Sequence, residues 1–214
     1  MLNTLRNPTF RHLFAAQIVA LLGTGLATVA LGLLAWQLAG DNAGAVLGTA
    51  LAIKMIAYVT LAPVAAAFAE RLPRRAFLVA LDLIRAGVIA CLPFVDQVWQ
   101  IYVLIFFLQA ASAGFTPAFQ AVVPDVLKDE DDYTNALSLL RLAEDLEQLA
   151  SPMIAALLLT VVSFPVLFAG TVVGFLASAL LVVTARLPDR VRVENAQFWA
   201  DVTKGIRIYT RTPR

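Results

Sequence analysis

The stretch Leu140-Arg-Leu-Ala-Glu-Asp-Leu-Glu-Gln-Leu-Ala-Ser-Pro152 decides how the whole chain is interpreted, because it places charged residues inside a run that is long enough to be a membrane helix. At 3.6 residues per turn, one face of that helix collects Arg141, Glu144, Asp145, Gln148 and Pro152. A charge in hydrocarbon is costly, so this face should turn toward a protein interior or a water-filled cavity. Either Arg141 only neutralises Asp145 one turn on, or the face lines a transport pathway.

The composition indicates a membrane protein. Of the 214 residues, 60% are hydrophobic and 14% are charged, whereas a soluble domain carries about 25% charged residues. One cysteine (Cys91) and one histidine (His12) cannot supply a disulfide framework, a zinc site or a Cys/His catalytic pair. We therefore expect no metal site, no cofactor and no enzymatic activity, and we expect no nucleic-acid partner.

Six apolar stretches, each about 20 residues or longer, follow one another along the chain. The expected spans are residues 13–40, 44–69, 77–95, 98–123, 135–162 and 165–185. The predicted fold class is an all-α membrane protein in which residues 1–185 form a six-helix transmembrane bundle. Residues 186–214 are predicted to be a basic, amphipathic, cytoplasmic linker or tail.

The basic residues predict the orientation. With six spans both termini lie on one side, and that side holds all but three of the 16 lysines and arginines. The other three, Lys54, Arg85 and Arg141, fall inside spans, so the opposite loops carry none. The positive-inside rule then places both termini in the cytoplasm.

Four of the spans carry a polar or charged face. Besides the face in the fifth span, the candidate cavity-lining residues are Gln17, Thr24, Thr28, Tyr58, Gln109, Ser112, Thr116 and Gln120. For the threonines, the alternative is a hydrogen bond back to their own helix.

Two other spans carry patterns that point to packing. Asp82 and Arg85 are i,i+3 neighbours expected to pair, although Arg85 has the alternative of extending toward the nearby loop. Gly170, Gly174 and Ser178 have the spacing that lets two helices approach closely.

Lys54 lies about as deep in the second span as Glu144 and Asp145 lie in the fifth, near the midplane at 1.5 Å per residue. The two helices can therefore bring opposite charges together. The spans hold three bases and four acids, and a carboxylate left without a counter-charge tends to hold a proton. One hypothesis is that Glu144 or Asp145 is a proton site poised by Lys54 and Arg141. The other is a fully paired, static network.

The loop between the second and third spans, Ala66-Ala-Phe-Ala-Glu-Arg-Leu-Pro-Arg-Arg75, resembles the signature Gly-x-x-x-Asp-Arg-x-Gly-Arg-Arg of the major facilitator superfamily. The charges match, whereas the two glycines are replaced. In that family the loop latches the two halves of the transporter. The loop motif comprises Glu70, Arg71, Arg74 and Arg75. By the resemblance, the latch falls on Glu70, Arg71 and Arg75, with Asp125 as the candidate partner. Anchoring of the arginines at the cytoplasmic surface is the simpler interpretation, and both can hold.

Further segments are similar to drug-efflux-like bacterial permeases of this superfamily. Thr116–Pro124 and Thr134–Leu137 look like the exit of span four and the entry of span five. Ser151-Pro-Met-Ile-Ala-Ala156 is similar to the Gly-Pro-x-x-Gly-Gly motif of antiporters, without its glycines. The chain thus resembles the amino-terminal six-helix half of such a permease. The resemblance implies that spans one, two, four and five line a central cavity and that two halves rock against each other.

The function implied by the resemblance is secondary active efflux of a small molecule across the bacterial inner (plasma) membrane, by proton-coupled antiport. Its partners would be the lipid bilayer, the substrate and protons. Because the family has twelve spans, we expect either a missing C-terminal six-helix half or a second copy to complete the cavity. The alternative is a non-transporting membrane remnant or a half that binds a partner. Neither the substrate nor the direction follows from the residues.

Overall fold

The computed structural model describes residues 4–69 and 72–185, so the basic tail expected at 186–214 lies outside the described residues. The described residues form six long helices: α1 (Pro8–Ala39), α2 (Ala43–Ala69), α3 (Arg74–Cys91), α4 (Val98–Val126), α5 (Glu130–Leu159) and α6 (Phe164–Thr184). Short 3₁₀ turns lie at Thr4–Arg6, Gly40–Asn42 and Leu92–Phe94. The all-α prediction is confirmed, and each expected span corresponds to one of these helices.

Local capping explains where the helices depart from the expected bounds. Asn7 accepts hydrogen bonds from the backbone N–H groups two and three residues on, and Asp129 does the same at the start of α5. Both helices therefore begin before the apolar pattern does. The α3 helix instead ends early, because Pro93 lies in the 3₁₀ turn that follows it.

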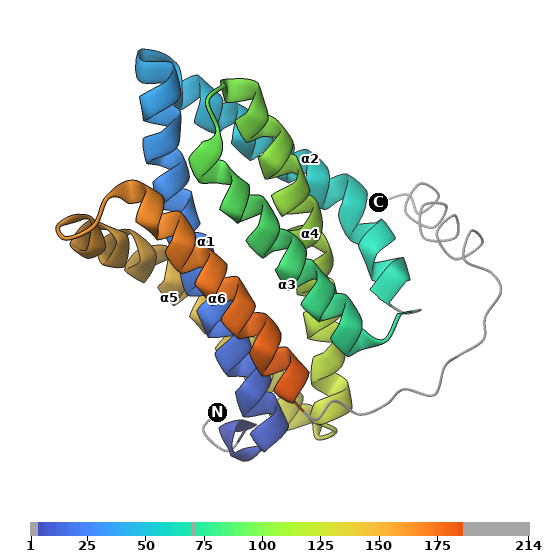
Figure 1. The fold of residues 1–214 in the computed structure, drawn as a ribbon. Helices are drawn as coiled ribbons and strands as arrows, with labels where there is room; N and C mark the ends of the chain where they lie inside the picture. Colours follow the sequence, from blue (N-terminus) through green and yellow to red (C-terminus); the bar gives the residue numbers. More distant parts are fainter. Residues whose placement is uncertain (1–3, 70–71, 186–214) are drawn as a thin grey trace, which may run out of the picture.

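The helices form a bundle organised around α1 and α6, which run side by side (Figure 1). The α6 helix also packs on α3, α3 packs on α4, and α4 packs on α2. The α5 helix is held mainly by α1 and contacts α4 and α6 much less. The start of α1 and the end of α6 lie at the same end of the bundle, at the bottom of Figure 1.

Small residues bring α1 and α6 together. A Cβ atom on Gly174 would lie 3.2 Å from the carbonyl oxygen of Val19, and one on Gly23 would lie 3.3 Å from that of Thr171. The Thr171 hydroxyl donates a hydrogen bond to the Gly23 carbonyl at 2.8 Å. Of the small residues expected to let helices approach closely, Gly174 does so against α1, whereas Ser178 donates a hydrogen bond to Asp82 of α3.

Four segments of the described residues are long and apolar enough to cross a membrane: Pro8–Ala62, which holds α1 and most of α2, and then Arg74–Phe94, Val98–Val126 and Phe164–Thr184. The chain reverses direction between α1 and α2 at the turn Gly40–Asn42 (Figure 1). The α5 helix is not among the four segments. Its 30 residues are long enough, but its middle carries the charges of the Leu140–Pro152 stretch.

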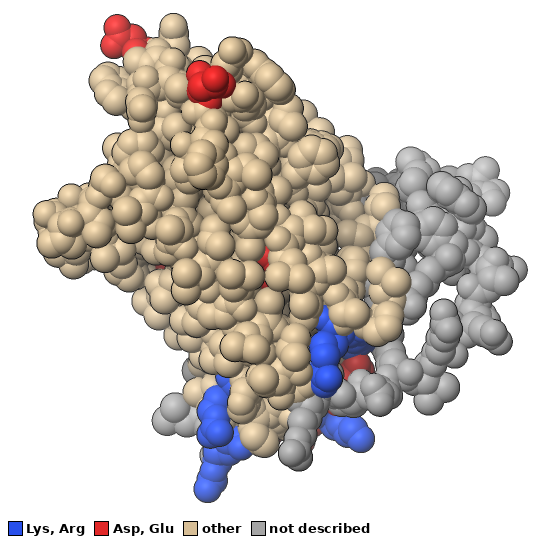
Figure 2. Space-filling view, viewed as in Figure 1, with Lys and Arg blue, Asp and Glu red and all other residues tan. Residues whose placement is uncertain are grey.

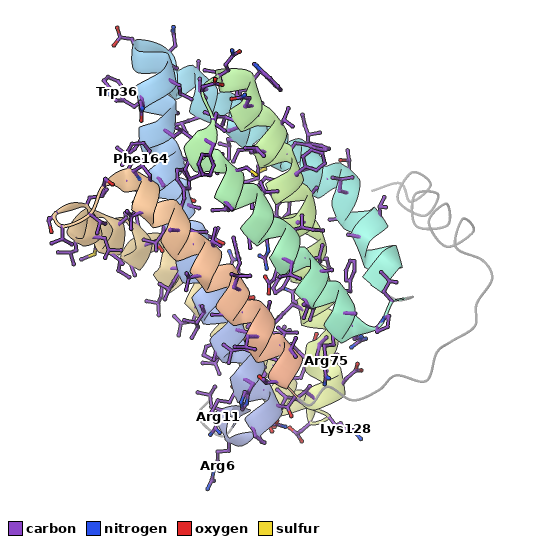
Figure 3. The ribbon with its side chains drawn as sticks, viewed as in Figure 1. Arg6, Arg11, Trp36, Arg75, Lys128 and Phe164 are labelled. Atoms are coloured by element: carbon purple, nitrogen blue, oxygen red, sulfur yellow. The ribbon has the colours of Figure 1, made fainter. Side chains whose placement is uncertain are left out.

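The surface charges separate along the bundle. Lys and Arg side chains gather at the lower end of the visible face, whereas the upper end shows acidic side chains and no basic ones (Figure 2). Arg6, Arg11, Arg75 and Lys128 lie toward the lower end, and Trp36 lies toward the upper end (Figure 3). The fold therefore brings the described basic loops to one end, as the expected topology requires.

Candidate functional site: the charged face of α5

Three stripes run along α5. Its buried residues form the stripe that packs on the bundle: Ala136, Leu140, Ser151 and Ala155. A second, apolar stripe is exposed and holds Leu142, Leu146, Leu149 and Met153. Between them lies the charged face, on which Arg141, Asp145, Gln148 and Pro152 are exposed and Glu144 is half-buried. An exposed polar stripe beside an exposed apolar one indicates two different surroundings for the two sides of α5.

Arg141 pairs with both acids expected near it. Its Nη1 lies 2.9 Å from Glu144 Oε2, and its Nε lies 3.7 Å from Asp145 Oδ1. The side chains of Arg141 and Asp145 are 72% and 58% exposed. Exposed pairs of this kind contribute about 0.2–1 kcal/mol, so they do little to hold the fold together. Arg141 offsets one of the two acid charges, so the face keeps one excess negative charge, and it is exposed.

Glu147 is the one acid in the middle of α5 that does not lie on the charged face. It is half-buried at the packing stripe, where the Ser151 hydroxyl donates a hydrogen bond to its Oε1 at 3.0 Å. Gly25 of α1 makes room for both side chains. A Cβ atom there would lie 2.3 Å from Glu147 Oε1 and 2.0 Å from Ser151 Oγ. The signal in the sequence is that Glu147 stands seven residues after buried Leu140 and four before buried Ser151.

Lys54 of α2 is half-buried. Its charge acts on Glu147 at long range, as does that of Glu144 on the same helix. The expected approach of Lys54 to Glu144 and Asp145 stays a prediction.

The α2 and α4 helices contribute a polar wall. The two helices pack against each other, and Tyr58 of α2 is half-buried. Gln109, Ser112 and Thr116 are half-buried, and Gln120 is exposed.

The predicted lining residues of α1 behave differently. The hydroxyl of Thr24 donates to the carbonyl of Ala20 at 2.9 Å, and that of Thr28 donates to the carbonyl of Thr24 at 3.0 Å. Both threonines therefore adopt the alternative of bonding to their own helix, although both are exposed. Gln17 is buried.

A second charged cluster is buried between α3, α4 and α6. Arg85 forms an ion pair with Asp82, and the Ser178 hydroxyl donates to Asp82 Oδ2 at 2.8 Å. The Arg85 guanidinium also lies 4.0 Å from the ring centroid of Phe115 and 4.6 Å from that of Phe175. The expected pairing is confirmed. The alternative of Arg85 extending toward the loop is wrong, because its side chain is 6% exposed.

The first turn of α3 is tied to the ends of α4 and α6 at the basic end. Arg74 forms an ion pair with Asp125 and also donates to the carbonyl of Ala121, so the start of α3 is held to the end of α4. Arg75 donates to the carbonyl of Ala185 at 2.7 Å. The resemblance gave the latch to Glu70, Arg71 and Arg75, whereas in the structure it is Arg74 that binds Asp125. Glu70 and Arg71 lie outside the described residues.

The sequence matches the family described as Major Facilitator Superfamily over residues 13–213. The chain belongs to the major facilitator superfamily. It is a multi-pass membrane protein, and its family points to transport and not to covalent catalysis.

Relatives within the superfamily include two macrolide efflux proteins A. The protein from Streptococcus pyogenes is 25% identical over 207 residues, covering 93% of this chain and 50% of the relative. The protein from Enterococcus faecalis is 25% identical over 175 residues, covering 76% of this chain and 54% of the relative. The chain spans about half the length of the curated relatives it matches.

The buried Asp82–Arg85 pair predicts a specific pattern of stability. Asp82→Ala is expected to lower the free energy of unfolding by about 3–5 kcal/mol, because it leaves the Arg85 charge buried without its partner. The double variant Asp82→Leu, Arg85→Met should be less destabilised than Asp82→Ala, because it removes both charges. Thermal unfolding in detergent, followed by loss of helical circular dichroism, measures both.

The matched control is Arg141→Met, which removes the cation of an exposed pair and should change stability by about 1 kcal/mol or less. Equal stability of Asp82→Ala and Arg141→Met would contradict the assignment of Asp82 and Arg85 as a buried pair.

Proposed function

We propose that this chain forms the amino-terminal six-helix half of an efflux-type secondary transporter that exchanges a small molecule for protons across a bacterial inner membrane. The charged face of α5 carries the proposal. It lies in the middle of a helix of a membrane protein, and Arg141 and Asp145 are mostly exposed. A charge at the centre of a membrane costs about 2.5–3.5 kcal/mol even on the most lenient scale, so lipid is an unsuitable neighbour for this face.

The neighbouring helices supply the rest of the proposed cavity wall. Lys54 and Tyr58 come from α2, and Ser112 and Thr116 come from α4, all of them half-buried. Together with the α5 face they give a surface with charges of both signs and neutral hydrogen-bonding groups. A second six-helix unit, either a C-terminal half or a second copy of this chain, would close the opposite wall and shield the face from lipid.

The proposed orientation places both termini in the cytoplasm, supported by the collection of the described basic residues at one end of the bundle (Figure 3). In a Cys91→Ser background, Asp96→Cys and Lys128→Cys place single thiols at exposed positions of opposite ends. A membrane-impermeant maleimide added to intact cells is expected to label Asp96→Cys and to label Lys128→Cys only after lysis. The reverse pattern would contradict the orientation.

The efflux proposal predicts lower drug accumulation. The relatives are named for macrolide efflux, so a radiolabelled macrolide is the first substrate to test. Cells that lack their own macrolide efflux and produce this chain should accumulate several-fold less drug than cells without it. A protonophore should abolish the difference, because the exchange uses the proton gradient.

Two variants sharpen the transport test. Arg141→Ala should lose the effect, because it leaves the acids of the α5 face without their cation. Thr184→Ala, on the exposed side of α6, should retain it. Macrolide binding to the purified chain without any flux would support the alternative of a non-transporting half, and transport that ignores the protonophore would contradict proton coupling.

A further inference from the structure

We propose that Glu147, and not Glu144 or Asp145, is the carboxylate of this half that binds and releases the transported proton. The proposal rests on the proposed function, because a proton site matters only if transport uses protons. It names one residue for that role, and this residue lies on a different side of α5 from the exposed face.

The first argument is the position of Glu147 on α5. Arg141 holds Glu144 and Asp145 within its own hydrogen-bonding and ion-pairing range on the open face, where water can reach them. Glu147 instead lies at the packing stripe, half-buried between α5 and α1. Because Glu147 lies between two helices, the packing of these helices controls when it can exchange a proton. A carboxylate on the open face is accessible from the cavity at all times.

The second argument is its hydrogen bond. The Ser151 side chain is fixed in place, because the residue is 2% exposed, and its hydroxyl lies 3.0 Å from Glu147 Oε1. A hydroxyl both donates and accepts hydrogen bonds. Ser151 can therefore donate to the ionised carboxylate and accept from the protonated acid, so the contact survives both states without rearrangement.

The third argument is the surface opposite Glu147. Gly25 presents bare backbone to both side chains, and any Cβ atom there would overlap them. Since α5 is held mainly by α1, a small shift of α5 along α1 changes the burial of Glu147 directly. This couples the protonation state of Glu147 to the relative position of the two helices.

The charged groups around Glu147 are few. Lys54 of α2 and Glu144 of α5 act on it electrostatically. The basic residues of α1, Arg11 and His12, lie near the first turn of that helix, and α6 carries no charged residue.

Carbodiimide labelling tests the assignment on the purified chain in lipid vesicles. Dicyclohexylcarbodiimide reacts with protonated carboxyl groups in apolar surroundings, and peptide mass spectrometry locates the product. We expect modification at Glu147 that falls as the pH rises. Glu147→Gln should lose it, whereas the matched variants Glu144→Gln and Asp145→Asn should keep it.

Modification of Glu144 or Asp145 with none at Glu147, or no modification of any of the three at any pH, would overturn the proposal. The labelling does not depend on transport, so the two hypotheses fail separately. Labelling at Glu147 in a chain that moves no macrolide would leave the site standing and remove the efflux proposal. Proton-driven efflux that persists in Glu147→Gln would leave the function standing and remove the site.

Discussion

The cost of placing a charge in hydrocarbon governs the arrangement of this half-bundle. The charged side chains of the described residues lie in three kinds of surroundings. Most lie at the helix ends, with the basic ones gathered at one end. Asp82 and Arg85 are buried as a pair that Ser178 and two aromatic rings complete. The remaining charges of the helix middles lie on α2 and α5, and of these Arg141, Glu144 and Asp145 share one open face of α5. Only the last group needs something beyond the described helices to shield it from lipid.

The α1 helix positions α5 and α6, because its small residues let these neighbouring helices approach its backbone. Gly23 receives α6, whose Thr171 bonds to its carbonyl, and Gly25 receives Glu147 and Ser151 of α5. Close packing through backbone atoms substitutes for the hydrophobic driving force that helices lack inside a membrane. The α1 helix therefore packs extensively against α6 and less extensively against α5. Only the packing stripe of α5 is buried, so its charged face stays open.

Much of this organisation follows from the sequence alone. Apolar runs of membrane length predicted the six helices, and the i,i+3 spacing predicted the Asp82–Arg85 pair. The placement of Glu147 against α1 did not follow, because helical periodicity shows which residues share a face but not which face meets a neighbour. That depended on Gly25, more than 100 residues away in sequence. The choice of Arg74 over Arg75 for Asp125 likewise depended on the helix phase at which α3 begins.

The most direct test of the central claim is a cysteine scan of residues 141–153 in the membrane, in a Cys91→Ser background. A hydrophilic thiol reagent reacts only with thiols that meet water. We predict fast reaction at positions 141, 145, 148 and 152 and slow reaction on the apolar stripe at 142, 146, 149 and 153. Equal rates on the two stripes would show that the charged face of α5 does not line a water-filled cavity, and the account would fail.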